Sequence, residues 1–135
     1  MTNMPDGLAN RILEGSPDAV LVSDREGTIR FWNASAERIF GFPSADAIGQ
    51  SLDIIIPERF RERHWAGWFK AMTTGETRYD DGRLLSVPAL RKDGQRISIE
   101  FSIQLLKRLD GRIEWIAAVI RDVTLRYSKE KNLKS

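Results

Sequence analysis

The feature that most constrains the fold is a strictly alternating segment in the C-terminal half of the chain. Apolar residues at positions 97, 99, 101 and 103 alternate with serine or glutamate at 98, 100 and 102. Such alternation predicts a strand with one buried and one polar face. Asp-Gly pairs at 93–94 and 110–111 mark hairpin turns on either side of it. The pattern therefore predicts three antiparallel strands, at about 84–90, 97–103 and 113–120, with Pro88 favouring an edge position or a bulge in the first.

The first half of the chain predicts two more strands and then a helical region. Residues 19–23 and 28–32 are rich in β-branched and aromatic side chains, and a turn that ends at Gly27 separates them. Asn33 is a typical N-cap, and short helical patterns follow it as far as Gly75. Strands at both ends of a helical middle predict an α+β fold, in which one antiparallel sheet is covered on one face by helices.

Composition excludes several classes of function. The chain has 135 residues and no cysteine, which rules out disulfide scaffolds, thiolate zinc sites, iron–sulfur clusters and cofactors attached through sulfur. Its net charge is +2, and the basic residues are interspersed with acidic ones, so we expect no nucleic-acid partner. No apolar run approaches the ~20 residues that span a bilayer, and the N-terminus lacks a secretory pattern. We expect a cytoplasmic domain that has no membrane partner.

No catalytic constellation stands out. Asp80 and Asp81 are adjacent carboxylates, but no third hard ligand follows at a matching spacing. The single histidine, His64, is not accompanied by a nucleophile elbow, and the chain has no glycine-rich phosphate loop. We therefore expect no catalytic residue and no enzymatic activity within this chain.

Several stretches in a fixed order resemble the PAS domain, the sensory module of the S-box type. They extend from about Leu8 to Thr124, and they comprise residues 16–20, 22–24, 27–33, 36–42, 48–49, 56–57, 91–94 and 120–124. The resemblance implies a five-stranded antiparallel sheet that cradles a pocket under the middle helices. Residues 1–15 would then be a lead-in and flanking helix, 16–124 the PAS domain, and 125–135 the start of a C-terminal signalling helix. Such domains detect a ligand, a redox state or light.

His64 is the sharpest candidate for a cofactor ligand. Phe60, His64 and Trp68 are spaced i, i+4 and i+8, so they share one stripe of the predicted helix 58–72, which should face the sheet. An imidazole in an apolar cleft can ligate iron through one nitrogen, and Gly67 would leave room for a flat macrocycle. Residues 56–64 also resemble the corresponding helix of haem-binding, oxygen-sensing PAS domains, in which the histidine at this place is the proximal iron ligand.

The same resemblance implies a set of cofactor-binding residues around haem b. Lys70 falls at the place of a basic partner for a haem propionate, and Phe101 and Ile103 fall on the apolar distal wall. Arg83 lies near an arginine that hydrogen-bonds oxygen in some members, although this chain carries about two extra residues between Arg83 and Gly94. The only metal ligand implied is His64.

Two alternatives to haem remain open at this point. The pocket can hold an organic or flavin ligand, although the absence of cysteine excludes photochemistry that needs a reactive thiol. It can also be empty, filled by Trp65 and Trp68, in a domain that serves as an interaction module. In that case the helix at Leu8–Leu13 and the sheet face around Trp115 would form a homodimer. The helix after Thr124 would connect to an effector domain or partner protein.

Overall fold

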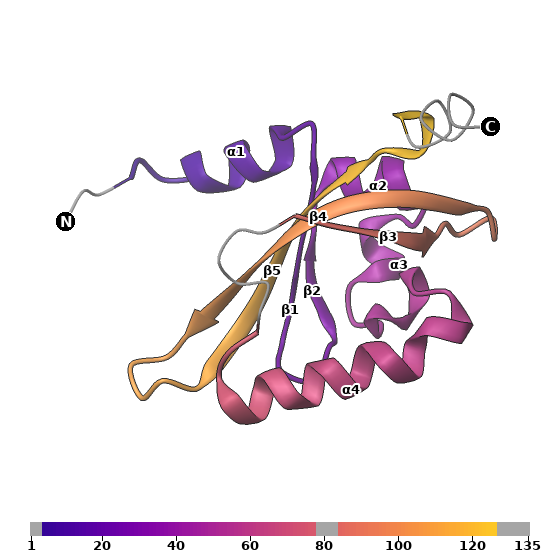
Figure 1. Cartoon of the computed structure of the whole chain (residues 1–135). Coiled ribbons are helices and arrows are strands. Elements are labelled where there is room, and N and C mark those ends of the chain that lie inside the picture. Colours follow the sequence, from indigo (N-terminus) through magenta and orange to yellow (C-terminus); the bar gives the residue numbers. More distant parts are fainter. Residues whose placement is uncertain (1–3, 78–83, 127–135) are drawn as a thin grey trace.

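The centre of the molecule is a five-stranded antiparallel sheet (Figure 1). The computed structural model describes residues 4–77 and 84–126. The strands are β1 (Ala19–Ser23), β2 (Ile29–Trp32), β3 (Leu85–Leu90), β4 (Arg96–Lys107) and β5 (Ile113–Asp122). Their order in the sheet is β2-β1-β5-β4-β3. The predicted α+β plan is confirmed, and Pro88 lies on an edge strand as expected, because β3 pairs only with β4.

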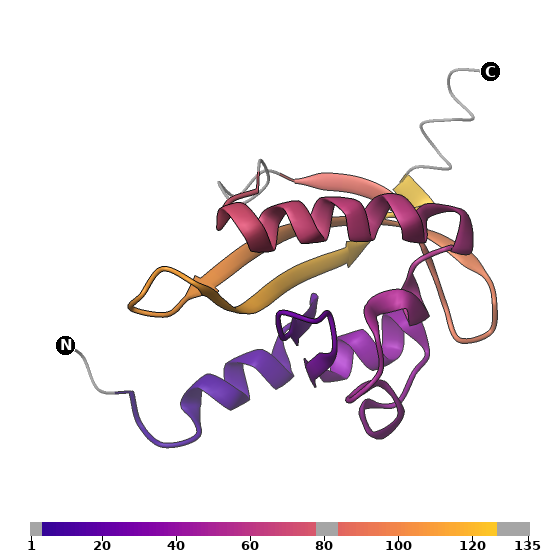
Figure 2. The ribbon, with the colours of Figure 1, turned by 90° about the horizontal axis from the view of Figure 1, so that it is seen from below.

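Helices precede and follow the first hairpin. They are α1 (Leu8–Gly15), α2 (Ala34–Phe40), α3 (Ser44–Ala47), the 3₁₀ helix η1 (Leu52–Ile55) and α4 (Glu58–Thr74). In both Figure 1 and Figure 2, α1 and α4 lie on opposite sides of the molecule. The helical segments predicted between Asn33 and Gly75 correspond to α2, α3, η1 and α4. The residues described contain no helix that is long and apolar enough to cross a membrane.

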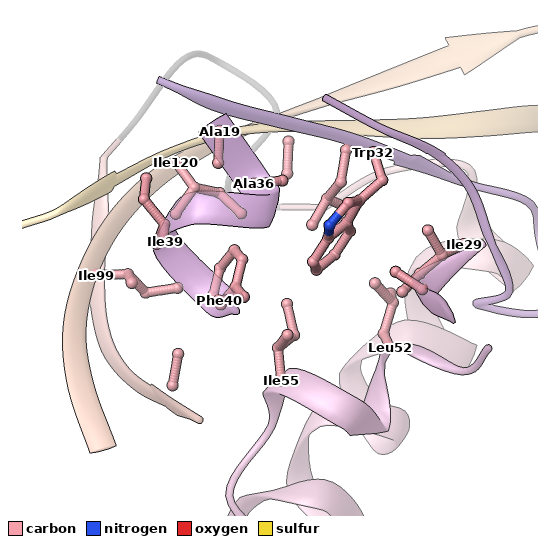
Figure 3. Close-up of a cluster of buried hydrophobic side chains, with 14 of the residues drawn as sticks. Ala19, Ile29, Trp32, Ala36, Ile39, Phe40, Leu52, Ile55, Ile99 and Ile120 are labelled. Atoms are coloured by element: carbon pink, nitrogen blue, oxygen red, sulfur yellow. The ribbon is translucent and has the colours of Figure 1, made fainter. Parts of the chain in front are cut away.

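The core lies between one face of the sheet and the helices α2, α3, η1 and α4. The alternating residues of β4 point into it, because Ile97 and Ile99 are buried together with Ile120 on β5. Trp32 and Phe40 fill its centre with ring centroids 5.4 Å apart (Figure 3). The Trp32 indole N–H donates to the carbonyl of Phe42 at 2.9 Å, so this large side chain is buried without an unsatisfied donor.

Asn33 links three segments from a fully buried position. Its side-chain oxygen accepts from the backbone N–H groups of Ala36 and Val20, both at 2.9 Å. Its side-chain nitrogen donates to the carbonyls of Leu13 at 2.8 Å and Asp18 at 3.1 Å. The predicted N-cap of α2 is confirmed, and the same side chain also fixes the end of α1 beside the start of β1.

The chain leaves the sheet through a hydrogen-bonded junction at the end of β5. The carboxylate of Asp122 accepts from the backbone N–H of Thr124 at 2.9 Å. The hydroxyl of Thr124 accepts from the backbone N–H of Ser98 on β4, also at 2.9 Å. Residues 124–126 form the helical turn expected here, and the remainder of the predicted signalling helix, 127–135, lies outside the described residues.

Candidate functional site

The candidate site is built on α4, the longest helix. The preceding Pro57 has extended backbone angles, and Gly75 ends the helix in the left-handed conformation with φ of 74°. The inward side carries Ala71, which is buried, and Trp65 and Trp68, which pack against the core cluster. Of the predicted stripe, Trp68 thus faces the protein interior and His64 is half-buried beside it.

His64 is packed among aromatic side chains on this helix. Its ring lies 4.5 Å from the ring of Trp65 in an edge-on arrangement and 5.7 Å from that of Trp68, measured between centroids. The Nδ1 atom is buried and has no hydrogen-bond partner in the described part of the chain. A buried polar atom without a partner is costly in a stable fold, so this nitrogen is available for a ligand.

Trp65 is held in place by a contact that the sequence spacing did not suggest. Its indole N–H donates to the carboxylate of Asp53 on η1 at 2.7 Å. Gly27 lies under the indole ring, where an added Cβ would stand 2.3 Å from a ring carbon of Trp65. Glycine is also required there because its φ is +80°. The β1–β2 turn therefore provides the space that lets Trp65 approach.

Trp68 connects the helix to the sheet through Arg25. Its indole N–H donates to the carbonyl of Arg25 at 2.7 Å. The Arg25 guanidinium in turn donates from Nη1 to the carbonyl of Ile113 at 2.8 Å, at the first residue of β5. These two hydrogen bonds link α4, by way of Arg25, to the first residue of β5.

Burial controls the protonation of His64. Desolvation of the charged form lowers the pKa of the imidazole below its ordinary value of 6.5, and the negative charge of Asp53 opposes this only in part. Neutral imidazole is the form that ligates a metal ion. The described residues contain no group of three or more His, Cys, Asp or Glu side chains that could hold a metal ion.

The lowered pKa of His64 predicts a pH dependence of stability. The unfolded chain binds a proton at this position more readily than the folded chain, so stability is fully present above about pH 6.5 and is lost as the pH falls towards the folded pKa. Urea unfolding between pH 7.5 and 5.5 measures the effect. His64→Gln is expected to remove this part of the profile, and an unchanged profile in that variant would contradict the assignment.

The other residues of the predicted site are distributed over α4 and β4. Phe101 and Ile103 are half-buried on the face of β4 that points to the core, opposite Ile120 and Ala118 of β5. Lys70 is exposed on α4. Arg83 lies outside the described residues. The structure therefore groups His64 with two tryptophans and places the expected apolar wall on the core-facing side of the sheet.

Two residues of the site were missed by sequence reasoning. Asp53 binds Trp65 and lies near His64, but it comes from a short 3₁₀ helix that leaves no periodic signal. Arg25 contributes its backbone carbonyl to Trp68, and a backbone acceptor has no signature in the sequence. Phe60 was expected to face the sheet together with His64 and Trp68. Its ring instead lies beside two cations, because the guanidinium groups of Arg59 and Arg96 are 4.8 Å and 5.9 Å from the ring centroid.

Comparisons with known proteins agree with this architecture. A family model described as the PAS fold matches residues 13–128. The crystal structure of the PAS domain of a protein from Colwellia psychrerythraea is similar to this chain, with a TM-score of 0.74 and 22% sequence identity. That likeness covers 87% of this chain and 95% of the other, and it supports the fold.

Two curated sensor proteins are similar in sequence. Sensor protein FixL of Bradyrhizobium diazoefficiens is 33% identical over 114 residues, which cover 84% of this chain. Oxygen sensor protein DosP of Escherichia coli is 21% identical over 132 residues, which cover 98% of it. The chain spans 22% of the length of the first protein and 16% of the second. The match is thus to a part of each of these longer proteins.

Proposed function

The chain belongs to the PAS fold family, a sensory domain typical of signal-transduction proteins, and from that premise we propose that it binds haem b through His64. The observation that carries the proposal is the imidazole itself, whose Nδ1 is buried without a partner and whose lowered pKa favours the neutral, ligating form. Bound haem would supply an iron atom that takes up diatomic gases and changes oxidation state. The sequence similarity to an oxygen sensor protein supports a diatomic gas as the stimulus.

Other residues would position the cofactor and isolate it from water. Phe101 and Ile103 offer an apolar wall on the sheet, and the exposed ammonium of Lys70 is free to meet a propionate. Trp65 and Trp68 stand against the imidazole and would have to shift to admit a macrocycle. In this proposal the chain acts as a cytoplasmic binding domain with no catalytic centre of its own.

The proposed output runs from α4 to the end of β5. The bonds from Trp68 to Arg25 and from Arg25 to Ile113 connect the helix that carries His64 to the first residue of β5. At the other end of that strand, Asp122 and Thr124 fix the start of the next helical turn. A ligand that favours one of two packings of α4 would bias the direction of the predicted signalling helix. That change in direction would reach an effector domain or partner protein.

Haem titration followed by tryptophan fluorescence tests the proposal. Trp65 and Trp68 lie next to His64, so haem bound there should quench their emission strongly and saturate at one equivalent. His64→Ala is expected to abolish the tight, saturable phase, whereas Phe69→Ala, at an exposed position on the same helix, should leave it intact. Equal titration curves for wild type and His64→Ala would contradict the proposal.

A second candidate function is homodimerisation, and it rests on two uncovered apolar surfaces. The helix α1 is amphipathic but buries none of its residues, and Ile12 is 58% exposed. On the outer face of β5, Trp115 and Val119 are 36% and 42% exposed. Exposed apolar groups gathered in this way are typical of an interface between subunits. A second copy of the chain is the proposed partner.

Sedimentation of the whole chain tests the dimer. We expect a dimer at about 100 μM protein, and a shift to monomer in the double variant Ile12→Gln with Trp115→Ala. Leu109→Ala, at a fully exposed position in the β4–β5 turn, is the matched control and should sediment as wild type. A monomeric wild-type chain at this concentration would refute the dimer and leave the haem proposal standing.

A further inference from the structure

A charged hollow lies away from α4, where the two ends of the domain meet. Its volume is about 390 Å³, which is within the range of small-ligand sites. Four separate segments contribute to it: the link between α1 and β1, helix α2, the turn that follows β3 and the end of β5. Besides Ile39, it is lined by Pro17, Asp18, Arg38, Arg91, Arg121 and Asp122.

The two carboxylates of the hollow are already engaged. Asp18 accepts from Nε of Arg121 at 3.3 Å. Asp122 accepts from both the backbone N–H and the hydroxyl of Thr124. These bonds use one oxygen of each carboxylate, Oδ2 of Asp18 and Oδ1 of Asp122. Three guanidinium groups face the hollow against two carboxylates.

Arg38 and Arg91 both retain N–H donors that could bind a ligand. Arg38 donates from Nη2 to the carbonyl of Pro17 at 3.0 Å, and it has no carboxylate partner in the described part of the chain. Arg91 donates from Nη1 to the carbonyl of Ile39 at 2.6 Å and to that of Arg38 at 3.2 Å. A guanidinium group carries five N–H donors. Arg38 uses one of them and keeps four, whereas Arg91 uses three, the third from Nε to Asp93, and keeps the two on Nη2.

Arg91 is also held rigidly and partly out of water. Its two carbonyl acceptors lie in the last turn of α2, where a cation is favoured by the helix dipole. Its side chain is only 28% exposed, and its one carboxylate partner, Asp93, lies outside the hollow. A guanidinium fixed in this way binds an oxyanion without losing further side-chain freedom.

We propose that this hollow binds a small, doubly charged oxyanion, such as a phosphoryl group or a dicarboxylate. Arg38 and Arg91 are the primary donors, and Arg121 adds a third once the ligand competes with Asp18. The anion would then connect the segment that enters β1 to the segment that leaves β5. Because Asp122 accepts from the backbone N–H of Thr124, the first residue of the helical turn after β5, occupancy of the hollow would stabilise one position of that turn independently of any ligand at His64.

The proposal is tested by following the amide chemical shifts of the whole ¹⁵N-labelled chain during a titration with sodium phosphate. Sodium chloride keeps the ionic strength constant. We expect saturating amide shifts centred on Asp18, Arg38, Arg91 and Arg121. Arg38→Gln should weaken the affinity by about tenfold, the value of one charge-assisted hydrogen bond. Arg63→Gln, at an exposed arginine on α4, is the matched control and should bind as wild type. Arg121→Gln provides a second variant with the same expected direction.

A parallel titration with sodium malonate separates the sources of the anion. Saturation with phosphate alone assigns the hollow to a phosphoryl group, saturation with malonate alone to a dicarboxylate, and saturation with both to dianions in general. Three results would overturn the proposal. These are an absence of saturation with either salt below about 10 mM, equal weakening by Arg38→Gln and Arg63→Gln, and shifts centred elsewhere in the molecule.

Discussion

Replacing Asn33 by leucine is expected to lower the free energy of unfolding by about 4 kcal/mol. The side chain is fully buried and makes four hydrogen bonds, to Val20, Ala36, Leu13 and Asp18. Leucine has a similar volume but leaves two buried N–H groups and two carbonyls without their partner. Each such group costs about 1–3 kcal/mol when it is left unsatisfied. Urea unfolding followed by circular dichroism gives the difference directly.

Asn10→Leu is the matched control for this prediction. Asn10 is exposed on α1, so the same substitution there should change stability by no more than about 0.5 kcal/mol. Asn33→Asp separates the two functions of the side chain, because it retains the acceptor that caps α2 but loses both donated bonds. A loss below about 1 kcal/mol in Asn33→Leu would show that Asn33 does not hold α1, β1 and α2 together.

Replacing Trp68 by alanine is expected to lower the stability of the fold and to raise the rate of haem association. Stability should fall by about 3 kcal/mol, at the lower end of the range for large-to-small core substitutions, because the side chain is only partly buried. The loss includes the hydrogen bond to the carbonyl of Arg25. At the same time, removal of the indole 5.7 Å from His64 uncovers one side of the imidazole, so haem should associate faster than with wild type.

Two measurements check the Trp68 prediction, urea unfolding and stopped-flow haem association. Phe69→Ala serves as the control, because this neighbouring side chain is exposed and its removal should change neither quantity appreciably. Slower haem association in Trp68→Ala would show that the indole helps to build the binding surface and does not cover it. Unchanged stability would contradict the packing of Trp68 against the core.

The sheet could be predicted because its signals are local. The alternation through Ile97, Ile99 and Phe101 gives the core-facing side of β4, and the Asp-Gly turn that ends at Gly94 joins it to β3. The central pairing of β1 with β5 joins residues about 100 positions apart, for example Ala19 and Ile120. Nothing in either segment specifies that partner, because strands with similar patterns can pair with one another in several orders.

Only part of the candidate site could be predicted, because the rest depends on contacts between segments that are distant in the sequence. The i, i+4 spacing correctly placed His64 and Trp68 on the inward side of α4. Trp65 follows His64 directly, so helical geometry alone turns it about 100° away. It nevertheless packs against the histidine, because Asp53 and the space above Gly27 draw its indole inward. Such contacts depend on tertiary structure and have no pattern in the sequence.

Visible absorption spectra of the whole chain loaded with haem b, recorded beside those of His64→Ala, test whether His64 ligates the iron. We expect a sharp Soret band in wild type and its loss in His64→Ala. The band should return when free imidazole is added to that variant, because imidazole can take the place of the missing side chain. A wild-type spectrum like that of free haem would contradict the claim that His64 ligates iron, as would a Soret band unchanged in His64→Ala.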